Sequence, residues 1–346
     1  MAYTTINKST DYFNTKLYTG NGGTQSITGV GFQPDFNWTK SRTTTQSHVL
    51  TDAVRGVTKT LFTNATQAEA TLSGITAFGT DGYTLGASDL WSENSASFAS
   101  WNWKANGAGS ANTDGSISST VSANTTSGFS IVSYTGNETV STIGHGLGVT
   151  PSMIIVKGLI SARDWIVGHH TQGWTKSAML NEANAFSSQT HWNNTAPTSS
   201  VFTIEGGSNS NVNTNNAGYI AYCFAEKQGY SKFGSYTGNG STDGTFVYTG
   251  FKPAFVLVKR TDAVANWSLI DNTRDPFNVT YHFLEPNVSD AEFTPSGPQA
   301  AFDFCSQGFK CRSTNGAINA SGGTYIYMAF AEAPLVGSNG VTAKAR

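Results

Sequence analysis

Charged residues are scarce in this sequence. Asp, Glu, Lys and Arg together make up 12% of its 346 residues, about half of the ~25% that is usual for soluble domains. The net charge is −2, and the 20 Lys and Arg residues are scattered along the chain. Because nucleic-acid binding depends on grouped cations that displace the counterions of the phosphates, we expect no nucleic-acid partner.

Long apolar runs are also missing. No run approaches the ~18 apolar residues that a membrane-spanning helix requires, so we expect no membrane insertion. The first residues, MAYTTINKST, contain no basic stretch followed by an apolar segment. We therefore expect no signal peptide.

Cysteine is rare, with only Cys223, Cys305 and Cys311 in the chain. This number is too small for a disulfide framework. Cys305 and Cys311 flank an expected turn, SQG, so a bridge between them is one interpretation. The alternative, which we favour, is that they are small apolar side chains in a reducing cell interior.

Helix-forming residues in amphipathic runs are nearly absent, and the residues that replace them are typical of β-structure. The chain contains 37 Gly, 21 Phe, 13 Tyr and 8 Trp, and it is rich in Ser, Thr and Asn. Aromatic and β-branched residues suit pleated strands, whereas Gly and Asn suit turns. With 38% hydrophobic residues the chain can bury a core, so the composition predicts an ordered all-β protein.

The tetrapeptide Tyr-Thr-Gly-Asn occurs three times, each time followed by Gly-x-x-Pro. Its tyrosines, Tyr18, Tyr134 and Tyr236, lie 16, 17 and 17 residues before Pro34, Pro151 and Pro253. A lysine follows six residues after each proline, and fourteen residues after it come His48, Trp165 and Trp267. Each copy ends in an aromatic stretch, with sequences FASWNWKA, YIAYCFAE and YIYMAFAE. These constant offsets indicate a threefold internal repeat.

The repeat predicts three tandem antiparallel β-sandwiches of ~100 residues, lectin- or jelly-roll-like in type. We expect repeat 1 over residues 1–104, a Gly/Ser/Asn/Thr-rich flexible linker over 105–128, repeat 2 over 129–227, repeat 3 over 228–334 and a tail over 335–346. Each repeat is expected to close its own hydrophobic interior.

The segments after the prolines, MIIVK and FVLVK in repeats 2 and 3, indicate buried strands that end in a solvated lysine. The first and last strands of a sandwich lie close together. We therefore expect Tyr134 near Tyr222, and Tyr236 near Met328. In repeat 1 the corresponding segment carries Asn37 and Thr39 where the other copies are apolar, which predicts different packing there.

The best place for a binding site is the segment after each proline-anchored strand. The candidate ligand-binding residues are Trp165, Trp267, Asp271, Arg274, Asp52 and Arg55. In one interpretation the rings and the Asp–Arg pairs form a sugar-binding patch. In the other, which we favour, the tryptophans share the face of an apolar position two residues later and point inward. The Asp and Arg would then pair at the end of the strand to hold the turn.

Other chemistry finds little support in the sequence. His145, His169 and His170 lack the accompanying Cys or carboxylates of a zinc site. Glu69 and Glu292 correspond between repeats, but both lie in polar segments where a solvated role suffices. The chain has no nucleophile elbow, phosphate loop or dinucleotide fingerprint. We therefore expect no metal, no cofactor and no enzymatic activity.

With these motifs identified, the chain resembles a family of virion proteins of marine tailed phages. The stretches that carry the resemblance include KLYTGNG, GVGFQPDF, AYCFAEKQGYSKFGSYTGNG and GTFVYTGFKPAFVLVKRTD, and it extends over essentially the whole chain. Such proteins are usually labelled tail-fibre-like or left as an uncharacterised domain. The resemblance implies a lectin-like β-sandwich for each repeat and location in the virion. It implies no particular catalytic or binding residue.

Two functions follow as expectations. The first is a tail-fibre-like adhesin that binds a host-surface glycan through its loops, among them residues 157–165, 178–202 and 277–302. The alternative is a non-catalytic head or tail decoration or spacer. The expected partners are other virion proteins and the chain itself, as a homotrimer. Three repeats in one chain could instead imitate that symmetry internally.

Overall fold

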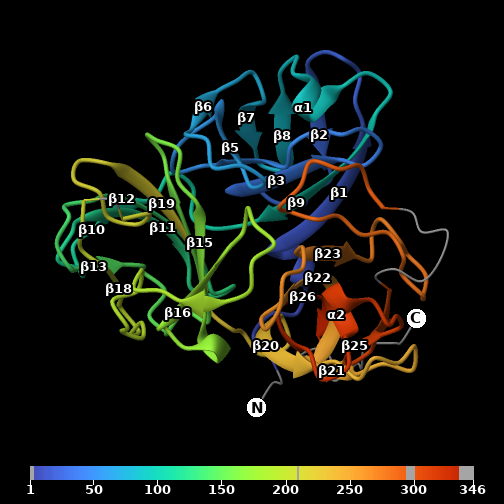
Figure 1. Ribbon diagram of the computed structural model, residues 1–346. Helices are drawn as coiled ribbons and strands as arrows, with labels where there is room; N and C mark the ends of the chain where they lie inside the picture. Colours follow the sequence, from blue (N-terminus) through green and yellow to red (C-terminus); the bar gives the residue numbers. More distant parts are fainter. Residues whose placement is uncertain (1–3, 209, 294–300, 335–346) are drawn as a thin grey trace.

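The computed structural model describes residues 4–208, 210–293 and 301–334 and is built almost entirely of antiparallel sheets (Figure 1). The helices among the described residues are single turns: η1 (Ser9–Asp11), α1 (Asp89–Ser92), η2 (His170–Gln172) and α2 (Gly316–Asn319). None of these helices is long and apolar enough to cross a membrane. The all-β prediction is confirmed.

Each repeat contains one larger sheet with the same order of four strands. The order is β1-β9-β3-β4 in repeat 1, β12-β19-β14-β15 in repeat 2 and β20-β26-β22-β23 in repeat 3. The strands of these sheets are β1 (Phe13–Thr19), β9 (Ser97–Trp103), β3 (Phe36–Ser41), β4 (Val49–Asp52), β12 (Phe129–Thr135), β19 (Gly218–Phe224), β14 (Met153–Gly158), β15 (Trp165–His169), β20 (Ser231–Thr237), β26 (Thr324–Pro334), β22 (Phe251–Arg260) and β23 (Ser268–Asp271). Strands β5 (Lys59–Phe62) and β6 (Ala70–Thr71) extend the first sheet, and β16 (Lys176–Met179) and β17 (Ser187–Ser188) extend the second.

A smaller sheet accompanies each larger one. Repeat 1 has β2 (Gln25–Thr28), β8 (Gly82–Leu85) and β7 (Ile75–Gly79); repeat 2 has β13 (Ser141–Gly144) and β18 (Val201–Ile204); repeat 3 has β21 (Phe246–Tyr248), β25 (Gly308–Cys311) and β24 (Phe302–Cys305). Between the two sheets of each repeat lies a separate hydrophobic cluster, centred on Trp91, Trp192 and Phe309 respectively.

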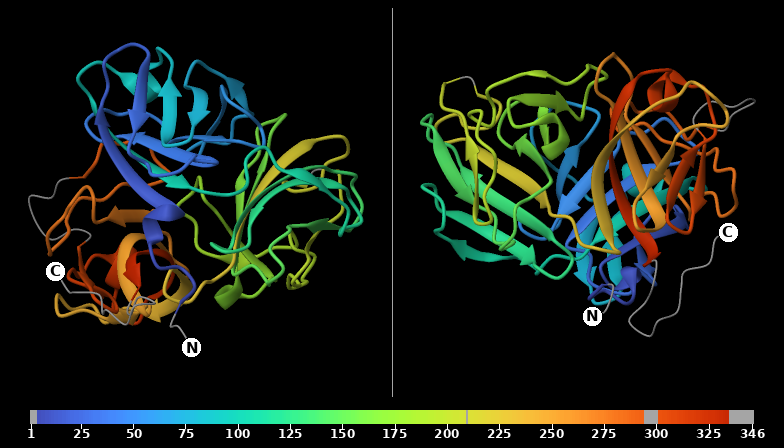
Figure 2. Two further views of the ribbon diagram at one scale, coloured as in Figure 1. Left: turned by 180° about the vertical axis from the view of Figure 1, so that it is seen from behind. Right: turned by 90° about the horizontal axis from the view of Figure 1, so that it is seen from below.

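The three larger sheets face one another around a shared core, which corrects the expectation that each repeat closes its own interior. Figures 1 and 2 show the repeats as three lobes around one centre. The core takes alternate residues of the central strands from all three repeats, so rings from different repeats meet. Phe36 packs on Tyr222 at 4.6 Å between ring centroids, and Phe13 on Phe330 at 5.1 Å. Since burial of one such side chain contributes about 1.5–3 kcal/mol, the shared core binds the repeats together strongly.

The Tyr-Thr-Gly-Asn motif has the same setting in all three repeats. Its tyrosine hydroxyl donates to a backbone carbonyl in each case: Tyr18 to Trp91 (2.8 Å), Tyr134 to Val212 (2.8 Å) and Tyr236 to Ile318 (2.7 Å). The asparagine side chain then accepts from the backbone N–H two residues later, in a turn typical of this residue. The recurrence is therefore structural.

Two glycines of the repeated motif have different roles. Gly31, Gly148 and Gly250, which open Gly-x-x-Pro, have φ values of 91°, 70° and 81°, where only glycine is unstrained. The glycine of Tyr-Thr-Gly-Asn has no positive φ in any of the three repeats. At Gly20 an added Cβ would lie 2.2 Å from the carbonyl oxygen of Glu93, so close approach of two backbone segments requires this residue.

The first and last strands of repeats 2 and 3 are paired as expected, but the register differs by three residues. Tyr134 lies opposite Tyr219 rather than Tyr222, and Tyr236 lies opposite Tyr325 rather than Met328. The reason is that Tyr222 and Met328 face the shared core, whereas the motif tyrosines face the smaller sheets.

The expected linker over residues 105–128 is wrong. Its strands β10 (Ser110–Asn112) and β11 (Ser119–Asn124) join the sheet of repeat 2, where β11 pairs with β12. The segment has few apolar residues, but backbone hydrogen bonds hold β10 at the edge of the sheet and β11 between β10 and β12, and Val121 of β11 is buried. The predicted tail over 335–346 lies outside the described residues.

Repeat 1 is packed differently between its sheets, as expected from Asn37 and Thr39. Asn37 Nδ2 donates to Asn102 Oδ1 (2.8 Å), and the Thr39 hydroxyl donates to Asn37 Oδ1 (2.8 Å). Tyr83 extends this buried polar layer through Ser100 (2.7 Å).

All three cysteines are free thiols, and Cys223 and Cys311 are buried.

Candidate functional site

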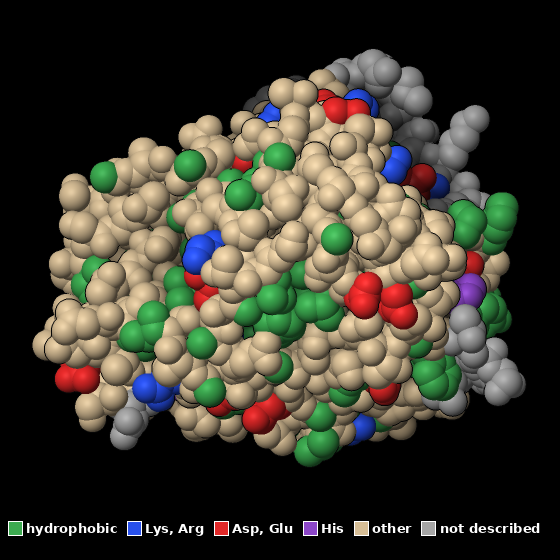
Figure 3. Space-filling model, turned by 90° about the horizontal axis from the view of Figure 1, so that it is seen from above, with side chains coloured by type: hydrophobic (Ala, Val, Ile, Leu, Met, Phe, Trp, Pro, Cys, Tyr) green, Lys and Arg blue, Asp and Glu red, His purple; other side chains and the backbone are tan. Residues whose placement is uncertain are grey.

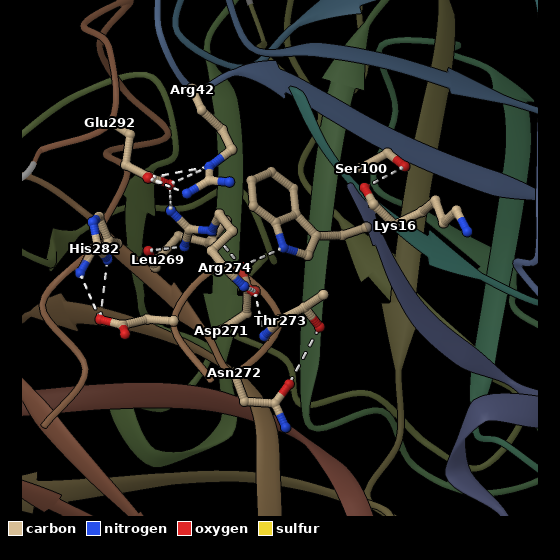
Figure 4. A network of polar contacts seen from close by, with 12 residues as sticks. Lys16, Arg42, Ser100, Leu269, Asp271, Asn272, Thr273, Arg274, His282 and Glu292 are labelled. Atoms are coloured by element: carbon tan, nitrogen blue, oxygen red, sulfur yellow. Dashed lines mark hydrogen bonds and ion pairs between the residues drawn. The ribbon is translucent and has the colours of Figure 1, made fainter. Parts of the chain in front are cut away.

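The candidate residues Asp271 and Arg274 lie at the end of β23, in contact with repeat 1 (Figure 4). Asp271 Oδ1 accepts from the backbone N–H groups of Thr273 (3.0 Å) and Arg274 (2.9 Å), which fixes the turn. Its Oδ2 accepts from Arg274 Nε and from Trp101 Nε1 of repeat 1 (3.0 Å).

Glu292 completes this cluster and joins it to a second arginine. Arg274 Nη1 donates to Glu292 Oε2 (2.8 Å), and Arg42 of repeat 1 donates through Nη2 to Glu292 Oε1 (2.7 Å). Burial alone would lower the pKa of Arg274, but the carboxylates of Asp271 and Glu292 outweigh burial and raise that pKa. The cation therefore stays charged in an almost water-free position.

Repeat 1 builds the same cluster against repeat 2. Asp52 Oδ2 accepts from Arg55 Nε and from the Tyr222 hydroxyl of repeat 2 (2.8 Å), while Arg55 Nη1 donates to Glu69 (3.0 Å). Burial, followed by the adjacent Asp52 carboxylate, raises the pKa of Tyr222, so this hydroxyl remains a donor. The side chain of Arg55 is 3% exposed and that of Asp52 is 0% exposed.

Repeat 2 replaces the aspartate with His169. The His169 Nδ1 atom lies 2.9 Å from the Thr171 hydroxyl, and the neighbouring His170 Nε2 lies 2.8 Å from the carbonyl oxygen of Phe233 in repeat 3. Burial, with a smaller contribution from His170, lowers the pKa of His169 to about 3. This position therefore holds a neutral imidazole.

Trp165 and Trp267 point inward and reach the repeat that precedes their own. Trp165 Nε1 donates to the carbonyl oxygen of Phe62 (2.8 Å), and Trp267 Nε1 donates to that of Met179 (3.0 Å). The corresponding residue of repeat 1, His48, is fully buried, and its ring faces the backbone of Glu285 in repeat 3. These residues connect the repeats as 1 to 2, 2 to 3 and 3 to 1.

The same cyclic order appears in the backbone. One amide of each repeat donates to the carbonyl that lies two residues beyond the repeated lysine of the next: Glu69 to Leu159 (2.9 Å), Phe186 to Thr261 (3.2 Å) and Glu292 to Arg42 (2.8 Å). We call each of these contact regions a joint. The six candidate residues are joint residues, and with their rings and charges buried they offer no sugar-binding patch on the surface.

The lysines of the repeat are buried, and two of them belong to the joints, which corrects their expected solvation. Lys40, Lys157 and Lys259 are fully buried, and burial lowers the pKa of each to about 8. Lys157 Nζ donates to the carbonyl oxygen of Thr66 in repeat 1 (2.8 Å), and Lys259 Nζ to that of Ala183 in repeat 2 (2.8 Å). Lys40, in contrast, donates to the carbonyl oxygens of Ser41 (2.8 Å) and Thr44 (3.2 Å) within its own repeat.

Metal-binding geometry is absent from residues 4–208, 210–293 and 301–334, where no group of three or more His, Cys, Asp or Glu side chains could hold an ion. The corresponding carboxylates Glu69 and Glu292 are 18% and 4% exposed, and each pairs with the arginine of its own joint cluster rather than standing in a solvated loop. On the face shown in Figure 3, charged side chains stand singly or in small groups among polar ones.

A concave site lies in repeat 3 and includes part of the loop 277–302, although none of the residues that line the site was identified from the sequence. This pocket has a volume of about 440 Å³, within the usual range for small-ligand sites. Its lining combines an exposed aromatic ring, two carboxylates, two amides and a guanidinium: Phe293, Glu285, Asp290, Asn266, Asn315 and Arg260. These residues do not belong to the repeated motifs. A comparison of the three repeats for residues that differ between them could therefore have pointed to the pocket.

Comparison with known families gives one match, over residues 8–334, to a family described as a domain of unknown function, DUF7483. The chain belongs to the DUF7483 family. No curated protein and no solved structure matches it. The region matched by DUF7483 contains all three repeats and every joint residue, so in this chain the family domain corresponds to the complete ring of repeats.

Proposed function

We propose that this protein is a structural protein of a tailed-phage virion and acts as a tail-fibre-like component in host recognition. Its partners would be other virion proteins and a glycan of the host surface, and its action would be binding without catalysis. We further propose that each pair of larger and smaller sheets is a lectin-like sandwich, so that the chain carries three such units in tandem.

The observation that supports this proposal is that the repeated residues have structural positions. The tyrosines, lysines, tryptophans and Asp–Arg pairs all pack within repeats or across joints. This arrangement gives a rigid scaffold, while the loops that differ between repeats remain available for contacts. Variable loops on a rigid β scaffold are a common basis for recognition.

The threefold arrangement bears on self-association. In the proposed virion, one chain with three repeats around a common core could take the place that three subunits occupy in a trimeric fibre. A homotrimer of such chains is the alternative. Light scattering on the purified protein separates the two, since it gives the mass of one chain or of three.

A decoration or spacer role is the second candidate, and one observation favours it. Exposed aromatic side chains gather in repeat 3, where Phe246, Tyr248 and Phe277 are 48%, 55% and 76% exposed. Exposed apolar groups of this kind are often buried against a neighbouring subunit. In this case the protein would contact other virion proteins and no glycan.

Copy number and position in purified particles test the proposal. Quantitative mass spectrometry and electron microscopy with a specific antibody should find a handful to tens of copies at the tail. Hundreds of copies over the head would favour the decoration role, and absence from the particle would refute both. Release of reducing ends from host polysaccharide by the purified protein would contradict a role in binding alone.

A further inference from the structure

We propose that the repeat 3 pocket binds a neutral pyranose ring, with Phe293 as the stacking platform and Glu285 and Asn266 as hydrogen-bonding partners for its hydroxyl groups. This inference rests on the proposed role in glycan recognition and assigns that role to a site. The ligand class is a neutral hexose or N-acetylhexosamine unit of a glycan.

The three repeats act as internal controls that separate scaffold residues from site residues. An asparagine recurs in each repeat: Asn64, Asn181 and Asn287 accept from the backbone N–H of His48, Trp165 and Trp267 at 3.0, 2.8 and 2.9 Å. These three asparagines hold the joints, and their recurrence is explained by the fold.

In repeat 3 this asparagine contact is one step longer and ends at a carboxylate of the pocket. Asn287 Nδ2 donates to Asn266 Oδ1 (2.7 Å), and Asn266 Nδ2 donates to Glu285 Oε2 (2.8 Å). In repeat 2 the chain of contacts stops at Asp164, and in repeat 1 it stops at Ser47. Glu285 is thus oriented by an amide that the scaffold holds, whereas in repeat 2 the scaffold asparagine Asn181 binds the acid Asp164 directly and no second amide follows.

The aromatic part of the pocket is also supported from below. Phe293 is 42% exposed and packs on the buried Phe283 at 5.0 Å between ring centroids, with an interplanar angle of 35°. The backbone N–H of Phe293 donates to the carbonyl oxygen of Phe283 (3.0 Å). An aromatic face is electron-rich and attracts the polarised C–H groups of a sugar ring, so a fixed and half-exposed ring is suited to stacking.

The charge distribution selects a neutral sugar. Glu285 and Asp290 place two carboxylates in the lining, and ionised carboxylates accept from paired hydroxyl groups. The one lining cation, Arg260, already donates to Asp262 through Nε (2.8 Å) and to the Gly316 carbonyl through Nη1 (3.3 Å). An anionic sugar would therefore meet repulsion that no lining cation is placed to relieve.

The test is a printed array of oligosaccharides that includes neutral hexose and N-acetylhexosamine chains and their sialylated and sulfated counterparts. Binding of the best free oligosaccharide is then followed by saturation-transfer NMR with the full-length protein. The variants are Phe293→Ala and Glu285→Gln. The matched control is Phe246→Ala, which removes an equally exposed ring of repeat 3 outside the pocket.

We expect the protein to bind neutral oligosaccharides and not their anionic counterparts. The Phe293→Ala variant should weaken binding about tenfold, and the control should leave it within about twofold. All variants should unfold at the same urea concentration as the parent protein, because neither ring is in the shared core.

Two results overturn the inference. If the parent protein binds a glycan but both pocket variants bind it equally well, the pocket assignment is wrong while host recognition stands. If the parent protein binds no glycan on the array, the pocket inference falls. The virion proposal is then judged separately by the position of the protein on the particle, which does not depend on sugar binding.

Discussion

The bond between Tyr222 and Asp52 offers the sharpest test of the joints, because its donor and acceptor belong to different repeats. The Tyr222→Phe variant removes only the hydroxyl, which is 2.8 Å from Asp52 Oδ2. Tyr222 is 1% exposed and Asp52 is 0% exposed, so water cannot replace the lost donor. Hydrogen bonds to charged groups contribute about 1.5–3 kcal/mol. We expect a loss of about 2 kcal/mol in the free energy of unfolding.

Tyr230→Phe is the matched control. Tyr230 is also fully buried in the shared core, but its hydroxyl has no hydrogen-bond partner among the described residues. Removal of an unsatisfied buried hydroxyl should leave stability unchanged within about 0.5 kcal/mol, or raise it.

The assay is urea unfolding followed both by tryptophan fluorescence and by far-ultraviolet circular dichroism. Because the core is shared, both signals should change in one transition, and Tyr222→Phe should shift that whole transition. In a thermal scan the expected shift is about 3 °C for a chain of this length. Equal midpoints for the two variants would refute the stabilising role of the joint. Separate transitions for separate repeats would refute the shared core itself.

Three further predictions concern other parts of the ring. The pKa of buried His169 is about 3 in the folded protein and about 6.5 when unfolded, so the unfolded state binds the extra proton first and stability falls as the pH drops below 6.5. At pH 5.5 this lowers the free energy of unfolding by about 1.4 kcal/mol. Between pH 7.5 and 5.5 the urea midpoint of His169→Asn should therefore depend less on pH than that of the parent protein. An equal pH dependence in both proteins would contradict the neutral imidazole. Gly20→Ala should destabilise the protein by about 1–3 kcal/mol, because the added Cβ would lie 2.2 Å from the Glu93 carbonyl oxygen. In the control Gly23→Ala the nearest atom to the added Cβ is at 3.7 Å, so stability should change by less than about 0.5 kcal/mol. Similar unfolding midpoints for the two variants would mean that the backbone approach at Gly20 is not tight. Finally, hydrogen exchange should protect the amides of Ser119–Asn124 about as well as those of β12, and rapid exchange there would restore the idea of a loose linker.

Repetition made much of the fold predictable. The offsets from the tyrosine to the proline and the lysine located the central strands, and period-two alternation placed Trp165 and Trp267 on the inner side. The proximity of the first and last strands of repeats 2 and 3 was also predicted, although their register was wrong by three residues. These features are local, so one sequence contains what is needed to predict them.

The sequence did not show which segment of another repeat packs against the inward face of each larger sheet. Lys157 looked solvated because the carbonyl group that receives it, that of Thr66, lies 91 residues earlier in the chain. The linker looked flexible because the apolar residues that it buries are only Ala105 and Val121, and backbone pairing leaves little trace in composition. The loop 277–302 was expected to make contacts, but Glu285 and Phe293 within it were not identified because they belong to no repeated motif.

Fusion of three repeats into one chain has an evolutionary consequence. In an assembly of identical subunits every substitution appears three times, and each contact must remain compatible with itself. Here each joint is encoded once. At the position that is Asp52 in repeat 1 and Asp271 in repeat 3, repeat 2 carries His169. The ring can therefore vary one repeat while the other two keep the shared core intact.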